Sequence, residues 1–121
     1  MIRLLLLCGA VLAQSPPPPA PAPDVWVPRT EARFSVLEKV RAQATPLSIK
    51  AGESAKVGSL TVALKSCVVR PPDQAADAAA AVDITDARPG APGFHGWLLL
   101  NEPSVSMLQN PIYDVRLVGC R

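Results

Sequence analysis

Apolar and polar residues alternate with a period of two in several short runs along most of this chain. The clearest runs are 47–50, 60–65, 82–85 and 113–117. This period is typical of β-strands that bury one face. Turn residues such as Gly52 and Gly58 separate the runs, and Pro71 ends the strand that begins at Leu60. Residues 94–100 form a further, mostly apolar run that predicts another strand.

Two segments do not follow the alternation. Residues 74–81 are rich in alanine, which has the highest helix propensity, so a short helical turn competes with a strand there. Residues 104–108 have the pattern of one helical turn, with Ser104 as a candidate N-cap and Pro111 forcing its end. The sequence therefore predicts a mainly β fold: a small single-domain β-sandwich or partly open barrel with one or two short helical turns.

The N-terminus has the pattern of a secretory signal peptide. Arg3 precedes the apolar run 4–12, and Ala13 supplies the small residue of a cleavage site, so we expect cleavage after Ala13. The run is shorter than the roughly 20 residues that span a bilayer, so we expect no transmembrane anchor. Lipid attachment at Cys8 is the alternative, but the bulky Leu7 before it disfavours that processing.

Proline divides the rest of the chain. Half of the 14 prolines lie between Ser15 and Pro28, where they favour an extended polyproline II spacer. We therefore expect three parts: a signal peptide at 1–13, a proline-rich linker at 14–32 and a β domain at 33–121.

Loss of the leader removes Cys8 and leaves Cys67 and Cys120. An even cysteine count in an exported protein predicts a disulfide, and two reduced thiols in a cytosolic protein are the alternative. By strand alternation, Leu64 and Leu117 face the core, whereas both cysteines have the opposite parity. If no bulge shifts the frame, this parity favours a bridge on the outer surface or rim of one sheet over one through the core.

Composition and charge exclude one class of partner. The chain has 12 Lys and Arg against 10 Asp and Glu, a formal charge of +2, and the basic residues are spread along the sequence. Nucleic-acid binding normally requires basic residues clustered on one face. We therefore expect no nucleic-acid partner.

Candidate catalytic groups are few. His95 is the only histidine, too few ligands for a zinc site and without a nucleophile in a suitable context, so we interpret it as a polar strand residue. The possible carboxylate pairs are Asp83 with Asp86 and Glu38 with Asp114, all at positions where solvated charges are common. We expect no cofactor, no metal site and no enzymatic activity.

Two aromatic residues could instead form an interface. Trp97 and Tyr113 offer large contact areas with a polar atom, but in a domain with only 4% aromatic residues core packing is the favoured role of each, and an interface is the alternative.

An ordered series of short motifs resembles a known family. These motifs are Val36–Val40, Gly52-Glu53, Gly58–Val62, Ser66-Cys67, Arg70–Pro72, Phe94–Trp97, Pro111–Val115 and Cys120. They resemble the bacterial domain-of-unknown-function family 2155 over roughly Phe34 to Arg121. The resemblance implies secretion, a periplasmic location in alphaproteobacteria and a paired Cys67 and Cys120; it implies no activity. At 80–82 this chain has smaller residues than we expect in relatives.

Taken together, the sequence predicts an exported, periplasmic, non-enzymatic module that binds or supports an unknown envelope component. A small-ligand or lipid carrier is the alternative, and a small hydrolase using His95 is a more remote one.

Overall fold

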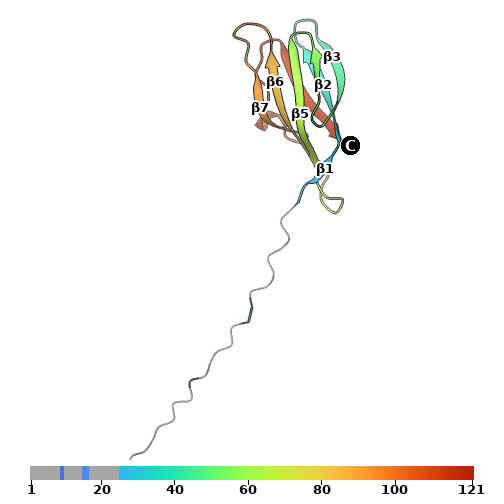
Figure 1. Ribbon diagram of the computed structural model, residues 1–121, viewed down its shortest axis with the longest axis vertical. Coiled ribbons are helices and arrows are strands. Elements are labelled where there is room, and N and C mark those ends of the chain that lie inside the picture. The colour runs from blue at the N-terminus through green and yellow to red at the C-terminus, as the bar shows by residue number, and fades with distance from the viewer. Residues whose placement is uncertain (1–8, 10–14, 17–24) are drawn as a thin grey trace, which may run out of the picture.

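The computed structural model describes Gly9, residues 15–16 and residues 25–121. Figure 1 shows residues 25–121 as one β-rich body. The predicted signal peptide, apart from Gly9, and most of the predicted linker lie outside the described residues, as does Cys8. The described part of the chain contains no helix with the length and apolarity needed to span a bilayer.

Eight strands and one short 3-10 turn form this body. They are β1 (Val27–Arg29), β2 (Glu31–Glu38), β3 (Gln43–Lys50), β4 (Ser54–Val57), β5 (Leu60–Val69), β6 (Ala78–Asp86), β7 (Phe94–Leu99), η1 (Pro103–Val105) and β8 (Tyr113–Cys120). The five strands expected from the sequence are all present, and β1, β2 and β4 add to them. The mainly β prediction is therefore confirmed.

The strands form two antiparallel sheets. The large sheet has the order β1-β5-β6-β7, with β4 also paired to β5, and the small sheet has the order β3-β2-β8. In Figure 1, β7, β6 and β5 lie side by side, with β2 and β3 beside them in the second layer. The two sheets do not close into a barrel, so the fold is the predicted sandwich.

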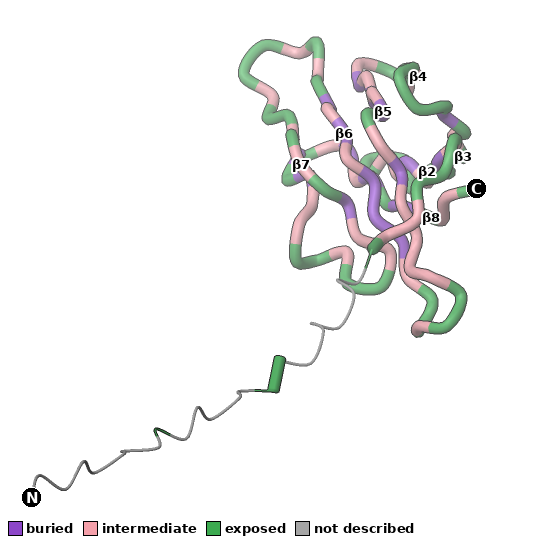
Figure 2. The backbone as a smooth tube through the Cα atoms, turned by 60° about the horizontal axis from the view of Figure 1, so that its bottom comes forward, coloured by how far each residue is buried: buried purple, intermediate pink, exposed green. Residues whose placement is uncertain are grey.

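The core lies between the two sheets. Figure 2 shows that the buried residues lie mainly along the strands, whereas the loops are mostly exposed or intermediate. The largest fully buried side chains are Phe34, Leu60, Leu64, Ile84, Leu108, Val36, Val62, Val82 and Val115. Apart from Leu108, they are alternate residues of β2, β5, β6 and β8, because successive side chains point to opposite faces of a sheet.

The two ambiguous segments are resolved differently. Residues 78–86 form β6, and Ala78 and Ala80 are buried in the core, so the helical alternative does not form there. Pairing with strands on both sides outweighs the high helix propensity of alanine, because intrinsic propensity is a small energy that tertiary context overrides. The second predicted turn exists as η1, but it begins at Pro103 with Glu102 at the cap position, so Ser104 is not the N-cap.

Cys67 and Cys120 form the expected disulfide, with their Cα atoms 5.9 Å apart. The predicted position on an outer surface or rim is wrong. Cys67 is only 1% exposed and belongs to the core, and Cys120 packs against it. Because β5 belongs to the large sheet and β8 to the small one, the bridge joins the two layers through the core.

Two β-bulges account for this difference. In β5, Leu64 pairs with Val82 but Ser66 pairs with the adjacent Ala81, so Lys65 is an extra residue. The extra residue shifts the alternation by one and turns Cys67 inward. In β8, the register against β2 shifts in the same way at Val118, where Leu117 pairs with Phe34 and Gly119 with Arg33, so Cys120 also turns inward.

The β domain begins earlier than predicted. β1 pairs with β5 from Val27 to Arg29, and β2 begins at Glu31, so the sheets include residues of the predicted linker, which ends at residue 32. Pro28 is compatible with β1 because β1 is an edge strand, where a missing amide donor costs little.

Candidate functional site

An apolar groove crosses the outer face of the large sheet. It encloses about 330 Å³ and is lined by Trp26, Val68, Ala79, Trp97 and Leu99. Strand pairing brings the lining residues together, since Val68 lies opposite Ala79 and Ala79 lies opposite Leu99. Residues that face each other across paired antiparallel strands share one face of the sheet. None of the five side chains carries a charge.

Trp26 forms the groove wall at the β1 edge. The guanidinium carbon of Arg70 lies 4.2 Å from the centroid of the Trp26 ring, within the range of a cation–π interaction. The pairing of β1 with β5 brings the two residues together, because Trp26 precedes β1 and Arg70 follows β5. The backbone amide of Arg70 also donates a 3.0 Å hydrogen bond to the carbonyl of Asp77. The indole is therefore held by a residue with a fixed backbone.

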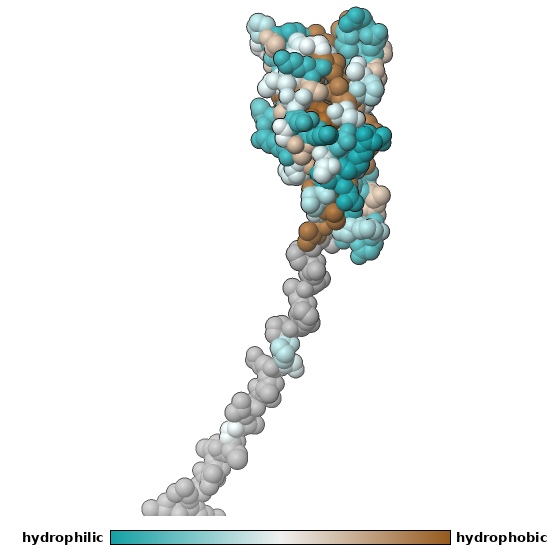
Figure 3. Space-filling view, turned by 45° about the vertical axis from the view of Figure 1, so that its right-hand side comes forward, coloured by the Kyte–Doolittle hydropathy of each residue, from teal (hydrophilic) through white to brown (hydrophobic). Residues whose placement is uncertain are grey.

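Trp97 forms the opposite wall, on edge strand β7. Its side chain is 44% exposed beside Leu99. Clustered exposed apolar side chains are informative, because such a patch indicates an interaction surface more often than a single exposed residue does. Figure 3 shows that hydrophobic residues also reach the surface at the base of the domain, where the described chain begins, although hydrophilic residues cover much of the face in view.

The second aromatic candidate has a different position. Tyr113 is 8% exposed and belongs to the core, as the alternation of β8 predicts. Its hydroxyl oxygen accepts a 3.4 Å hydrogen bond from the backbone amide of Ser59. Of the two predicted interface residues, only Trp97 is therefore available to a partner.

A charged cluster lies beside the groove on the same outer face. A carboxylate oxygen of Asp83 is 2.8 Å from Nδ1 of His95, and the other is 3.0 Å from Nζ of Lys65. The hydrogen bond to His95, followed by that to Lys65, lowers the pKa of the Asp83 carboxyl. His95 and Lys65 remain largely exposed, so His95 is a solvated strand residue with an ionic neighbour.

The structure does not bring the proposed carboxylate pairs together. Asp83 and Asp86 are three residues apart on β6 and therefore point to opposite faces. Glu38 lies opposite Tyr113 in the register of β2 and β8, whereas Asp114 lies opposite Leu37, so that pair is also divided between faces. Within the described residues, no group of three or more His, Cys, Asp and Glu is arranged to hold a metal ion.

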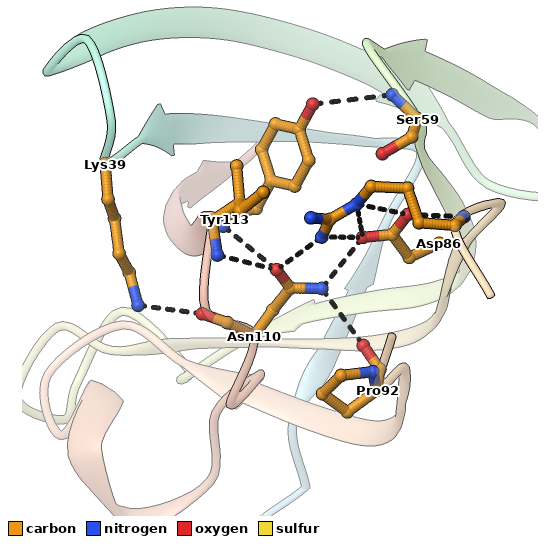
Figure 4. Close-up of polar contacts among 8 residues, drawn as sticks. Lys39, Ser59, Asp86, Pro92, Asn110 and Tyr113 are labelled. Atoms are coloured by element: carbon orange, nitrogen blue, oxygen red, sulfur yellow. Dashed lines mark hydrogen bonds and ion pairs between the residues drawn. The ribbon is translucent and has the colours of Figure 1, made fainter. Parts of the chain in front are cut away.

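A buried polar network at the other end of the sandwich was not predicted (Figure 4). Its centre is Asn110, which is 2% exposed. The Asn110 amide nitrogen donates to Asp86 at 3.0 Å and to the carbonyl of Pro92 at 3.1 Å. Its side-chain oxygen accepts from the backbone amides of Ile112 at 2.9 Å and Tyr113 at 3.1 Å. One side chain thereby fixes the start of β8 against the loop between β6 and β7.

Asp86 completes this network. Its side chain is fully buried and forms an ion pair with Arg88. The hydrogen bonds from Arg88, and then that from Asn110, hold the pKa of the Asp86 carboxyl far below its usual range. The guanidinium carbon of Arg88 also lies 5.8 Å from the centroid of the Tyr113 ring. The contacts of this network connect the loop between β6 and β7 to the start of β8, so we interpret the network as structural.

Sequence reasoning missed most of the groove. Trp97 is among the predicted interface residues, but Trp26 lies in the predicted linker, and strict alternation from Leu64 places Val68 on the core side of its strand. The available signals were the proximity of Trp26 to the first strand and the apolar pair Val68-Val69. Neither signal reveals the bulge that turns Val68 outward.

Comparisons with known proteins agree with the family resemblance. No curated protein and no solved structure matches the chain. A family model described as an uncharacterized protein conserved in bacteria (DUF2155) matches residues 32–120, which cover both sheets from β2 to β8. The chain therefore belongs to the DUF2155 family of bacterial proteins.

Proposed function

We propose that this protein is an exported, non-enzymatic module of the bacterial envelope that binds an extended polypeptide segment in the groove between Trp26 and Trp97. The observation that carries the proposal is the uncharged groove with a partly exposed tryptophan in its wall. Buried aromatic anchors supply much of the binding energy in protein interfaces. A groove open along a sheet face suits an extended chain better than a compact ligand.

Export is supported by the signal-peptide pattern and by the disulfide. Disulfides form and persist in oxidising compartments such as the periplasm, and the Cys67–Cys120 bridge lies in the core of this fold. Mass measurement of the protein recovered from the periplasm tests this part. We expect Gln14 as the first residue and a mass increase of two hydrogens on reduction. A retained leader or a free Cys67 would contradict export.

A non-enzymatic role is supported by where the candidate groups lie. The carboxylate pairs point to opposite faces, and His95 contacts Asp83 on an open surface beside Lys65. General acid–base catalysis favours groups whose pKa values are adjusted by a desolvated pocket. The lipid-carrier alternative requires an interior cavity, whereas packed side chains occupy the space between the two sheets.

Site-specific photo-cross-linking in the producing cells tests the binding function. A benzophenone amino acid replaces Leu99 in the groove, and the control position is Ala44, which is exposed on β3 of the small sheet. We expect an adduct from the groove position that is lost when Trp97→Ala is added and is kept when His95→Ala is added. Equal labelling from both positions, or no adduct, would refute the proposal.

A further inference from the structure

The groove has the chemistry of a site for proline-rich segments. Two indole rings, from Trp26 and Trp97, line an uncharged hollow whose other lining residues are Val68, Ala79 and Leu99. Grooves lined by aromatic rings bind polyproline II helices, because proline rings pack on aromatic faces and the helix is already formed before binding. Little conformational entropy is then lost on association.

The chain itself carries such a ligand. Every residue from Ser15 to Pro23 is either a proline or directly precedes one. Proline fixes its own φ and restricts the preceding residue to extended conformations, so this segment favours one stiff rod of about 25–30 Å. The rod carries no charge, which matches the uncharged lining of the groove. Only Asp24 and Val25 separate it from Trp26.

This short connection decides which copy of the chain provides the rod. To enter the groove of its own molecule, the rod would have to turn onto the sheet face within the two residues that separate it from Trp26. A stiff rod attached at the edge of the groove reaches the groove of a second molecule without so tight a turn. Exchange between two copies is also symmetric, so each chain gives one rod and accepts one. After the first contact forms, the second becomes intramolecular, which strengthens both.

We propose that the groove binds the proline-rich segment 15–23 of a second copy, so that two chains associate by exchanging their N-terminal arms. This inference rests on the proposed binding function of the groove and names its partner.

Sedimentation of the purified exported protein over a wide concentration range tests the exchange. We expect a reversible dimer that a synthetic peptide of residues 15–23 dissociates. The arm variant Pro17→Ser/Pro18→Ser/Pro19→Ser and the groove variant Trp97→Ala should each weaken dimerisation roughly thirtyfold or more, the effect of losing a hot-spot contact. His95→Ala, on the same strand outside the groove, should dimerise like the wild type. A protein that stays monomeric and does not bind the peptide would overturn the inference.

Mixing the two variants separates exchange from a structural defect. The arm variant keeps an intact groove, and Trp97→Ala keeps an intact arm, so a mixture of the two can form one arm–groove contact. We expect heterodimers in the mixture at concentrations where each variant alone is monomeric. If each variant alone is monomeric and the mixture is too, although both show wild-type circular dichroism, the arm does not act between copies and the inference fails.

The photo-cross-linker at Leu99 separates this inference from the proposed function. An adduct to residues 15–23 of another copy, shown by mixing isotopically labelled and unlabelled protein, supports the exchange. An adduct to a different polypeptide, or to the arm of the same molecule, overturns the exchange but leaves segment binding by the groove intact. No adduct overturns both.

Discussion

Removing the Cys67–Cys120 bridge should lower the free energy of unfolding by about 4 kcal/mol. The bridge closes a loop with a sequence separation of 53. A closed loop of this length removes conformational entropy from the unfolded chain, and the chain-entropy model gives about 4 kcal/mol at 25 °C. Domains of this size are stable by only about 5–15 kcal/mol, so a large share of the margin depends on this bond.

The suitable variant is Cys67→Ala/Cys120→Ala. Serine is less suitable because Cys67 is only 1% exposed, and a buried hydroxyl without a partner adds its own cost of about 1–3 kcal/mol. Urea unfolding, followed by tryptophan fluorescence, measures the midpoint and the dependence on denaturant for both proteins. We expect a lower midpoint and a steeper dependence, because the unfolded chain expands when the cross-link is absent.

Val118→Ala is the matched control. Val118 precedes the bridge on β8 but is 48% exposed, so its truncation should change stability by less than about 0.5 kcal/mol. If the double alanine variant loses less than about 1 kcal/mol, the loop-entropy argument does not apply to this protein. That result would mean that the unfolded chain is already restricted without the cross-link, or that the two sheets stay packed together without the bond.

Three further predictions concern the turn and the polar network. Gly58→Ala should destabilise the fold more than Gly52→Ala does. Both glycines have a positive φ, which costs other residues about 1–2 kcal/mol. Only at Gly58 would the added side-chain carbon also overlap the hydroxyl of Tyr113. Adding Tyr113→Phe to Gly58→Ala should therefore recover part of the loss in thermal unfolding. Because the folded-state pKa of Asp86 is lowered, its carboxylate stabilises the fold above the unfolded pKa near 4, and this stabilisation is lost as the pH falls further. Asp86→Asn should therefore flatten the acid side of the curve of stability against pH. An unchanged slope would contradict the assignment. Asn110→Ala leaves two backbone amides without their acceptor and should cost about 2–4 kcal/mol in denaturant unfolding, whereas a loss below about 1 kcal/mol would show that water replaces the side chain.

The sequence was sufficient to predict strands because alternation is a local property. Leu60, Val62 and Leu64 face the core, as does the series beginning at Tyr113, because burial of one sheet face requires a period of two. The alanine-rich segment shows where local reasoning stops. Its strand identity depends on β5 and β7, which pair with it on both sides and which no local propensity includes.

The polar network could not be predicted for a related reason. Asp86 and Asn110 are separated by the whole of β7 and η1, and either residue alone has the composition of an ordinary turn. The hydrogen bond that connects them forms only when the start of β8 packs against the end of β6. Spacing in a single sequence contains no information about that contact.

One bulge links the two features of greatest interest in this fold. If Lys65 were an ordinary paired residue, strict alternation from Leu64 would place Cys67 on the outer face of the large sheet and Val68 in the core. Because Lys65 is instead the extra residue of a bulge, Cys67 reaches the small sheet through the core, and Val68 becomes part of the groove beside Ala79. The same backbone irregularity therefore creates the covalent connection between the layers and part of the lining of the candidate binding site. Because Cys67 and Val68 are adjacent on β5, the bulge that turns one of them inward turns the other outward.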